Sequence, residues 1–553
     1  MTDTTDAQGI PEPTGHADLI ETEYEIGQDN IETNIGPFGL DIHNPVFLIS
    51  GLAIIAFVFY TLALPEQAGS AFSAIFAYVT QGFDWFFIAA ANIFVIFCLL
   101  LIVTPLGNVR LGGVDAKPDY TYVGWFAMLF AAGMGIGLMF YGVSEPLTHF
   151  STSFGGTTVE NGVRTDWAPL GGAEGDQHEA MRLGMAATIF HWGLHPWAIY
   201  AVVALALALF SYNKGLPLSI RSAFYPILGE RVWGWWGHII DTLAVFATLF
   251  GLATSLGLGA TQANAGLNEL FGVPVSNTTE VILISGITAI ALISVIRGLD
   301  GGVKILSEIN MGLAGLLLLF TLIVGPTVAV LTGFVDYLGA YFQYLPALSN
   351  PVGREDVNFM QGWTSFYWAW WISWSPFVGM FIARVSRGRS VREFIICVLL
   401  IPSLVCVFWM SIFGGTAIQQ VIQDGYTAAQ DAELSLQLFK MLDPLPLAGI
   451  TSLVGIVLVI VFFVTSSDSG SLVIDTITAG GKVDAPVPQR VFWCIFEGAV
   501  AIVLLLSAGG LSSLQSMVIS TGLPFTVVLL IMCFSIWKGL ASERRFTKEV
   551  AAE

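Results

Sequence analysis

Long runs of apolar residues recur along almost the whole chain, separated by short polar segments. A helix needs about 20 apolar residues to cross about 30 Å of hydrocarbon, and twelve runs come close to or exceed that length. The pattern therefore predicts an all-α membrane protein with twelve transmembrane helices. The predicted spans centre on residues 44–64, 84–104, 122–142, 180–210, 237–257, 280–296, 308–332, 363–383, 394–414, 448–475, 490–507 and 513–537.

The segments outside these runs are short and polar. Residues 1–43 hold ten carboxylates and no Lys or Arg, a composition typical of a disordered, solvated arm and unlike a cleaved signal peptide. Residues 44–540 form the twelve-helix domain, and residues 541–553 form a short tail. We expect the arm and the tail to lie on the same side of the membrane, because the number of spans is even.

Composition and charge support this topology. Hydrophobic residues make up 55% of the chain and charged residues 11%, whereas about a quarter of a soluble domain is charged. With twelve spans, seventeen of the 21 Lys and Arg residues fall on the side of the termini, which the positive-inside rule assigns to the cytoplasm. We expect no nucleic-acid binding, because no basic patch exists beyond these loops. The five cysteines lie in apolar runs without metal-ligand spacing and are interpreted as small hydrophobic residues.

The third predicted span contains the stretch AAGMGIGLMFYG, Ala131 to Gly142. Glycine destabilises a helix interior by about 0.5–1 kcal/mol relative to alanine. Gly133 and Gly137 form a GxxxG pair, which suits tight helix packing. Alternatively, the helix unwinds and frees carbonyl groups for a cation and N–H groups for an anion, which is tolerated where the backbone lines a cavity. Gly135 favours unwinding, since packing needs only the pair.

Aromatic residues gather beside prolines in two other spans. The stretch FYWAWWISWSPFVGMF, Phe366 to Phe381, contains Pro376 and is expected to interrupt a helix in the second half of the chain. The stretch FHWGLHPWAIY adds Trp192, Trp197 and Tyr200 around another proline. Tryptophans often mark membrane interfaces, but these lie in mid-span. They predict an aromatic cage for a quaternary ammonium group, which cannot donate hydrogen bonds and is held by ring faces.

Hydroxyl groups interrupt a later apolar run in VFFVTSSDSGS. Phe462, Thr465 and Ser466 share one helix face, and hydroxyl and carbonyl oxygens suit a small hard cation. Alternatively, the hydroxyls bond to their own helix, as is common in membrane spans. No histidine accompanies the serines as it would beside a nucleophile, so we expect no enzyme activity.

His191 and His195 have the i, i+4 spacing that can bind zinc from one helix face. No Glu follows His191, and no third ligand lies nearby in the sequence. We therefore expect no transition metal.

Three motifs together carry a family resemblance: GMGIGLMFYG followed by Ser144-Glu145-Pro146, HWGLHPWAIY, and FYWAWWISWSPFVGMFIARVSRGRS. From about residue 44 to 540 the chain resembles the betaine/choline/carnitine transporter family, and most of all its sodium-coupled glycine betaine members. The resemblance implies a leucine-transporter-like fold with two inverted five-helix repeats, spans 3–7 (122–332) and 8–12 (363–537). It also implies a homotrimer in the cytoplasmic membrane.

The resemblance further assigns site residues. The cage would be formed by Trp192, Trp197, Tyr200 and Trp371, with Trp374 meeting the substrate as the site opens inward. The glycine stretch would face the substrate through Gly133, Met134, Gly135 and Gly137, and Phe366 would act as a gate. One sodium ion would lie between the carbonyls of Ala131 and Met134 and the segment of Phe462, Thr465 and Ser466. A second would use Thr248 and the face of Phe377, but Leu252 replaces a threonine that relatives can offer one turn later.

These features predict a symporter that imports a zwitterionic compatible solute, glycine betaine first, with sodium as coupling ion and no other cofactor. Ectoine, proline or dimethylsulfoniopropionate import and proton-coupled choline transport are the alternatives. Choline carriers of the family tend to place an Asp in the glycine stretch, and this chain keeps Gly137. A channel would need repeated charged or carbonyl rings, which the sequence lacks.

Overall fold

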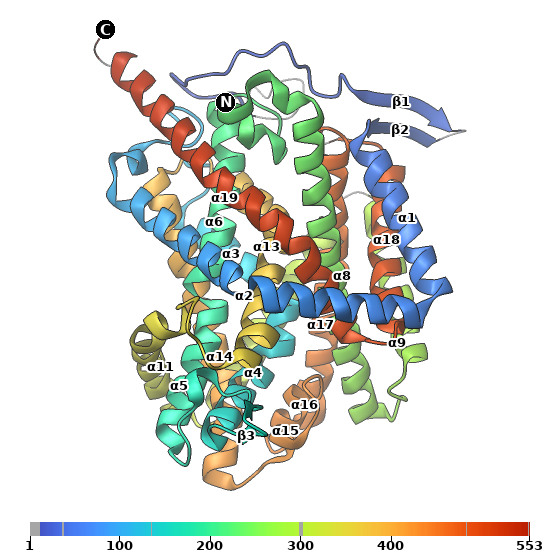
Figure 1. Cartoon of the computed structure of the whole chain (residues 1–553), viewed down its shortest axis with the longest axis vertical. Coiled ribbons are helices and arrows are strands. Elements are labelled where there is room, and N and C mark those ends of the chain that lie inside the picture. Colours follow the sequence, from blue (N-terminus) through green and yellow to red (C-terminus); the bar gives the residue numbers. More distant parts are fainter. Residues whose placement is uncertain are drawn as a thin grey trace.

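The computed structural model describes residues 11–35, 38–133, 135–297, 302–482, 484–550 and 552, and these form a bundle of long helices (Figure 1). The first ten helices are α1 (Val46–Ala63), α2 (Pro65–Val103), α3 (Tyr122–Gly133), α4 (Ile136–Gly155), α5 (Gln177–Trp192), α6 (Leu194–Ala208), α7 (Tyr225–Leu228), α8 (Trp235–Phe271), α9 (Asn277–Arg297) and α10 (Gly302–Val324). The others are α11 (Thr327–Leu348), α12 (Val357–Phe359), α13 (Ser365–Val385), α14 (Val391–Asp424), α15 (Ala428–Asp431), α16 (Gln437–Leu442), α17 (Ala448–Thr478), α18 (Val487–Leu506) and α19 (Leu511–Val550). Two small antiparallel hairpins pair β1 (Asn30–Ile35) with β2 (Phe38–His43) and β3 (Val159–Glu160) with β4 (Val163–Arg164).

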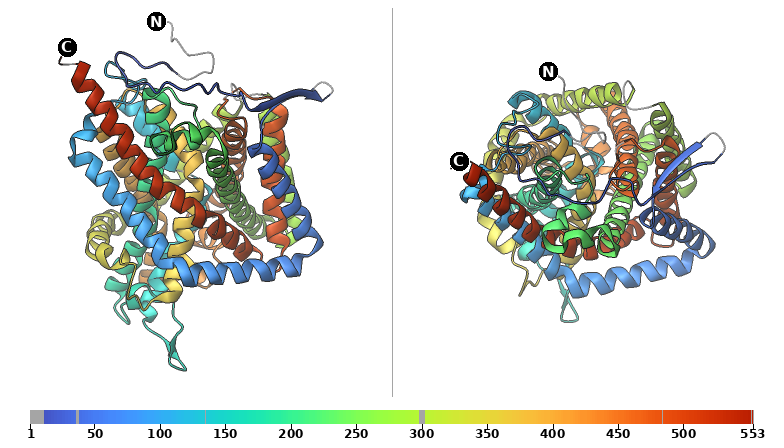
Figure 2. Two further views of the ribbon diagram at one scale, coloured as in Figure 1. Left: turned by 45° about the horizontal axis from the view of Figure 1, so that its top comes forward. Right: turned by 90° about the horizontal axis from the view of Figure 1, so that it is seen from above.

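The long helices are those of a multi-pass membrane protein. Within the described residues, ten helices are long and apolar enough to cross a membrane, or eleven if the bent pair α3–α4 forms one span. Helix α13, which occupies the predicted span 363–383, is not among them. The count of twelve spans therefore stays a prediction. Helix α2 runs along the outside of the bundle and packs against α19 (Figures 1 and 2).

Three helix boundaries differ from the sequence-based expectation. Helix α2 begins at Pro65, well before the predicted span, because proline is favoured in a first helical turn. The predicted span 308–332 is divided between α10 and α11, with Pro326 directly before α11. Helix α19 continues to Val550 through the expected tail.

The glycine stretch breaks its helix. The segments Tyr122–Ala132 and Ile136–Gly155 are bent by 67° relative to each other. Between them, Gly135 has an extended backbone (φ −176°, ψ −174°). The structure therefore favours unwinding over a simple packing pair. Met134 lies outside the described residues.

The interruption expected at Pro376 is absent, because α13 continues through this residue. Proline lacks the N–H that would bond to the carbonyl of Ile372 four residues earlier. The hydroxyl of Ser375 donates to that carbonyl instead, at 2.7 Å. The helical irregularity lies just before α13, in a π-helical turn over Met360–Thr364.

Between α5 and α6 the break falls at Gly193, not at Pro196. Pro196 lies in the first turn of α6, where a missing N–H removes no helical hydrogen bond.

The N-terminal arm also differs from the expected disorder. From residue 11 its described part lies across one end of the bundle, at the end where α19 terminates (Figures 1 and 2). The ring of Tyr24 stacks on Trp233, with centroids 4.3 Å apart, and its hydroxyl accepts a hydrogen bond from Arg221 at 2.7 Å. Carboxylates of the arm pair with distant cations, for example Asp41 with Lys482 at 2.5 Å. These contacts offset the repulsion between the carboxylates of the arm, which would otherwise favour disorder.

Lys214 joins the arm to the end of α19. Its side chain is 1% exposed, and its ammonium group donates to Asp18 at 2.6 Å, to Glu543 at 2.9 Å and to Ser542 at 3.0 Å. Burial alone would raise the pKa of the Asp18 carboxyl. Hydrogen bonds from Lys214 and Ser542 outweigh burial and hold that pKa below its usual value. The expected tail is therefore docked on the bundle.

We predict that Lys214→Met destabilises the protein strongly. Glu543, with a side chain 3% exposed, would lose its cation, and removing one partner of a buried ion pair costs about 3–5 kcal/mol. Lys482→Met is the matched control, because the Lys482 side chain is 21% exposed and its ion pairs to Glu32 and Asp41 are more accessible to water than those of Lys214. Thermal unfolding of the purified protein should show a much larger fall in Tm for Lys214→Met. Equal falls would show that the buried cluster contributes no more than the exposed one.

Candidate functional site

Two cavities meet at the break between α3 and α4. The smaller, of about 50 Å³, is called the ring cavity here because six tryptophan and tyrosine residues are among those that line it. The larger, of about 300 Å³, is called the hydroxyl cavity because Thr465, Ser466 and Ser469 line one side. Four residues line both cavities: Ala132, Gly135, Trp374 and Val378.

The ring cavity brings together the five aromatic residues assigned to substrate binding: Trp192, Trp197, Tyr200, Trp371 and Trp374. The rings of Trp192 and Trp371 lie 4.9 Å apart at 81°, and those of Tyr200 and Trp371 lie 5.8 Å apart at 89°. Trp197 meets Tyr200 at 5.3 Å and 76°. Nearly perpendicular rings can present faces to one small guest from several sides, as a cage for a cation requires.

The ring nitrogens are occupied by acceptors of the protein. Trp371 donates its indole N–H to the carbonyl of His191 at 2.9 Å. Trp374 donates to the carbonyl of Gly251, also at 2.9 Å. These bonds fix the orientation of each ring and leave its face for a ligand.

The glycines of the break occupy their positions for different structural reasons. A Cβ atom added to Gly137 would lie 2.8 Å from Cη2 of Trp370 and 2.9 Å from Cη2 of Trp192, so only glycine permits this approach. An added Cβ on Gly135 would meet nothing within 4 Å, because this residue borders both cavities. Gly133 is the last residue of α3.

The hydroxyl cavity contains the described residues assigned to the first sodium site: Ala131, Phe462, Thr465 and Ser466. The Thr465 hydroxyl donates to its own helix, to the carbonyl of Val461 at 3.0 Å. A hydroxyl that donates its hydrogen still has lone pairs for a cation. Back-bonding and cation binding, the two alternatives from the sequence, are therefore compatible at Thr465.

The residues assigned to the second sodium site are not gathered in the same way. Phe377 lines the hydroxyl cavity, whereas Thr248 is not among the described residues that line either cavity. The Thr248 hydroxyl is buried and donates to the carbonyl of Ala244 at 2.7 Å. Leu252 packs its side chain against Gly470 of α17 and offers no oxygen there.

Phe366, the expected gate, is 1% exposed and stacks on Trp370, with centroids 5.4 Å apart. It lies beside the ring cavity but is not among the residues that line it. Its role as a gate stays a prediction.

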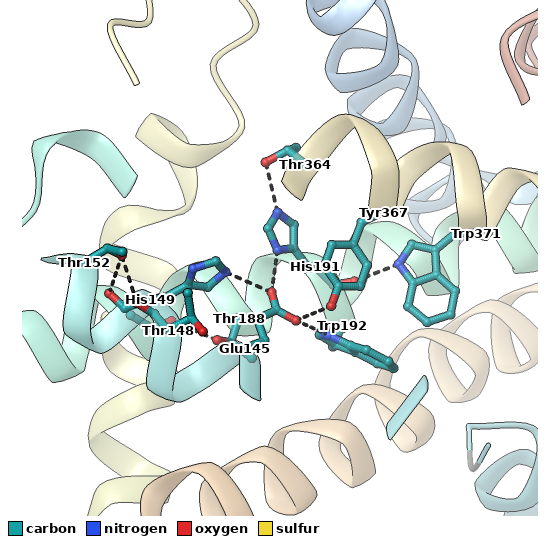
Figure 3. Close-up of polar contacts among 11 residues, drawn as sticks. Glu145, Thr148, His149, Thr152, Thr188, His191, Trp192, Thr364, Tyr367 and Trp371 are labelled. Atoms are coloured by element: carbon teal, nitrogen blue, oxygen red, sulfur yellow. Dashed lines mark hydrogen bonds and ion pairs between the residues drawn. The ribbon is translucent and has the colours of Figure 1, made fainter. Parts of the chain in front are cut away.

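Glu145 is the residue of this region whose role sequence reasoning missed. One carboxylate oxygen faces Nδ1 of His191 at 2.6 Å and Nε2 of His149 at 3.2 Å (Figure 3). The other accepts hydrogen bonds from the indole of Trp192 at 2.6 Å and the hydroxyl of Tyr367 at 2.5 Å. The available signal was an ionisable residue at the end of an apolar run, which is a candidate functional residue.

The same residues could hold a metal ion by geometry alone. The ligand atoms of Glu145, His149 and His191 lie within 4.8 Å of one another. They already satisfy one another through the hydrogen bonds of Figure 3. His195 instead faces Asn92 at 2.9 Å, so the two histidines of the i, i+4 pair have different partners. The absence of a transition metal stays a prediction.

Comparison with known families identifies the chain. The family described as "BCCT, betaine/carnitine/choline family transporter" matches residues 45–545. The chain belongs to this family. Members of the betaine/carnitine/choline family are transporters, so the protein is a multi-pass membrane transporter and not an enzyme.

Similar proteins cover almost the whole transporter. A glycine betaine/proline/choline transporter of Vibrio parahaemolyticus is 67% identical over 98% of this chain and 97% of its own length. A glycine betaine/proline/choline/ectoine transporter of the same organism is 53% identical over 94% of this chain and 91% of its own length. The glycine betaine transporter OpuD of Bacillus subtilis is 44% identical over 91% of this chain and 96% of its own length. A solved manganese transporter of Eremococcus coleocola is 11% identical, covers 79% of this chain and 82% of its own, and has a TM-score of 0.41, too low to say anything about the fold.

We predict that Trp371→Leu and Trp197→Leu each weaken solute binding more than they reduce folded transporter. A cation–π contact contributes about 0.5–2 kcal/mol per ring, so the dissociation constant should rise about two- to thirty-fold. Binding of glycine betaine followed by tryptophan fluorescence measures this change. Trp235→Leu, at a residue 66% exposed at the start of α8, is the control and should leave binding unchanged. Normal binding in both cavity variants would make these rings packing elements.

Proposed function

We propose that this transporter is a symporter that imports a zwitterionic compatible solute, glycine betaine first, together with sodium by alternating access. The observation that carries the proposal is the shared boundary of the ring cavity and the hydroxyl cavity at an unwound, uncharged backbone segment. Rings suit a quaternary ammonium group, and hydroxyl and carbonyl oxygens suit a small cation. The carboxylate of the solute can then meet freed backbone N–H groups or the sodium ion.

The tryptophan rings favour glycine betaine over solutes that need hydrogen-bond acceptors. An indole can donate a hydrogen bond but cannot accept one, so Trp371 and Trp374 offer a guest ring faces and no acceptor. A trimethylammonium group needs none, whereas proline and ectoine carry N–H donors. The names of the Vibrio parahaemolyticus relatives include proline, choline and ectoine. These solutes and dimethylsulfoniopropionate therefore remain alternatives, as does proton-coupled choline transport.

Sodium coupling also suits the task of accumulating a solute. One positive charge that crosses about 100 mV releases roughly 2.3 kcal/mol, which supports about fifty-fold accumulation. The hydroxyl cavity reaches Arg384, which the positive-inside rule assigns to the cytoplasmic end of α13. This position supports release of ion and solute toward the cytoplasm.

The proposal includes twelve spans and two inverted repeats in a leucine-transporter-like fold, assembled as a homotrimer. The helix contacts support the repeats, because α4 packs on α14 as α13 packs on α6. In the proposed repeats α4 corresponds to α13 and α6 to α14, so the two contacts are equivalent. The corresponding helices α8 and α17 also contact each other, as do α9 and α18. The N-terminal arm and the end of α19 lie at the same end of the bundle, which supports an even number of spans (Figure 1). The positive-inside rule assigns this end to the cytoplasm.

We predict that an inward sodium gradient drives uptake of labelled glycine betaine into vesicles and that a proton gradient without sodium does not. The physical reason is the supply of neutral oxygen ligands in the hydroxyl cavity. Proline, ectoine and choline are tested in the same vesicles. Full accumulation in sodium-free vesicles with a proton gradient would contradict the proposal and favour the proton-coupled alternative.

We also predict that Ser466→Ala raises the sodium concentration for half-maximal uptake by several-fold to about tenfold, since one oxygen ligand is lost. Thr465→Ala should act in the same direction. Thr248→Ala should have less effect, because Thr248 lies outside both cavities and Leu252 supplies no oxygen beside it. Sodium-dependent uptake and paired tracer fluxes measure this. A large effect of Thr248→Ala together with two sodium ions per solute would refute the expectation of a weak or absent second site.

A further inference from the structure

The carboxylate of Glu145 is fully engaged and fully buried behind the ring cavity. A carboxylate offers about four lone-pair sites, and four polar hydrogens face them, from His149, His191, Trp192 and Tyr367 (Figure 3). The donors come from α4, α5 and α13, so one side chain holds three helices of the site in register. Several hydrogen bonds to a buried carboxylate stabilise its charged form.

The partners of His149 indicate that its ring is neutral. Nδ1 of His149 has no hydrogen-bond partner among the residues that the structure describes, so the single proton of this ring belongs on Nε2, toward Glu145. A doubly protonated His149 would leave a buried N–H unpaired. Nδ1 of His191 also donates to Glu145, and its Nε2 lies 2.9 Å from the hydroxyl of Thr364, a group that can donate or accept a hydrogen bond.

Arg354 does not offset the charge of Glu145. Arg354 acts electrostatically on His191, but its guanidinium forms a two-pronged ion pair with Asp356 at 2.8 and 2.6 Å. Arg354 therefore leaves the negative charge of Glu145 beside the indole of Trp192 in place.

This charge acts on the rings that line the cavity. Trp192 gives its N–H to the anion and turns its ring toward Trp371, with centroids 4.9 Å apart. A hydrogen bond to an anion is stronger than one between neutral groups and polarises its donor. Electron density thus shifts onto the indole, and the negative charge lies one hydrogen bond behind a ring that borders the cavity.

We propose that Glu145 determines the charge specificity of the site: its carboxylate orients Trp192 and Tyr367 and makes the ring cavity electronegative, so that a cationic head group is selected over a neutral one of equal shape. The proposal rests on the proposed function, in which the ring cavity holds the ammonium group. Glu145 is a positioning residue that acts through the rings and does not itself touch the solute.

The test compares glycine betaine with 3,3-dimethylbutanoate, which replaces the ammonium nitrogen by carbon and keeps the shape. Equilibrium binding of both probes is measured on the full-length transporter and on Glu145→Gln, a substitution of equal size without the charge. One unit charge about 10 Å away at an effective dielectric of about 20 changes cation affinity by about tenfold. We expect Glu145→Gln to reduce the preference for glycine betaine over its carbon analogue by about that factor.

A purely structural role for Glu145 would weaken both probes equally and leave their ratio unchanged, which would overturn the proposal. If Glu145→Gln does not fold, Trp192→Phe keeps the anion and an aromatic ring but removes the N–H that joins them. It should lower the ratio about threefold more than Trp197→Phe, which changes a lining ring that does not bond to Glu145. Equal ratios in these two variants would also overturn the proposal. Trp371→Leu distinguishes a failure of the proposed function from a failure of the role of Glu145. Normal glycine betaine binding in Trp371→Leu would refute the proposed use of the ring cavity. Weakened binding in Trp371→Leu together with an unchanged ratio in Glu145→Gln would refute only the role of Glu145.

Discussion

Backbone N–H and carbonyl groups cannot be left unpaired against lipid, and this constraint shapes the centre of the transporter. The break between Gly133 and Ile136 interrupts helical hydrogen bonding within a segment of the bundle core. Such a break is tolerated only where protein groups, water or a ligand can satisfy the freed backbone. The structure places the ring cavity and the hydroxyl cavity at this position, with Gly135 bordering both.

A second break satisfies the same constraint in a different way. Helix α5 ends at Trp192, so the carbonyl of His191 belongs to its last turn and has no helical partner. The indole of Trp371 donates to this carbonyl. The group left unpaired by the end of one helix thus fixes a ring that another helix contributes. The orientation of the ring cavity follows from where α5 ends as much as from aromatic packing.

The sequence predicted the features that depend on local composition. Apolar length located the long helices, three alternate glycines located the unwound segment, and mid-span tryptophans located the ring cavity. It did not predict what depends on partners distant in the chain. Pro376 does not break α13 because Ser375 satisfies the freed carbonyl, and the acidic arm docks because Lys214, almost two hundred residues away, pairs with Asp18.

The partners of Glu145 were hidden for the same reason. The motif Ser144-Glu145-Pro146 shows a carboxylate near the end of an apolar run, but its four donors come from three helices. Their convergence depends on how α4, α5 and α13 pack. Packing of this kind leaves no periodic pattern that a single sequence could show.

The shared walls of the two cavities give a physical basis for coupling in the proposed mechanism. Ala132 and Gly135 belong to the broken first helix pair, and Trp374 and Val378 belong to α13, the corresponding helix of the second proposed repeat. Each cavity therefore requires the same placement of α3 and α4 against α13. A sodium ion that favours this placement favours solute binding as well, and the solute favours sodium binding by the same free energy. Coupling then requires no direct contact between ion and solute, and a movement that separates α13 from the broken pair weakens both sites together.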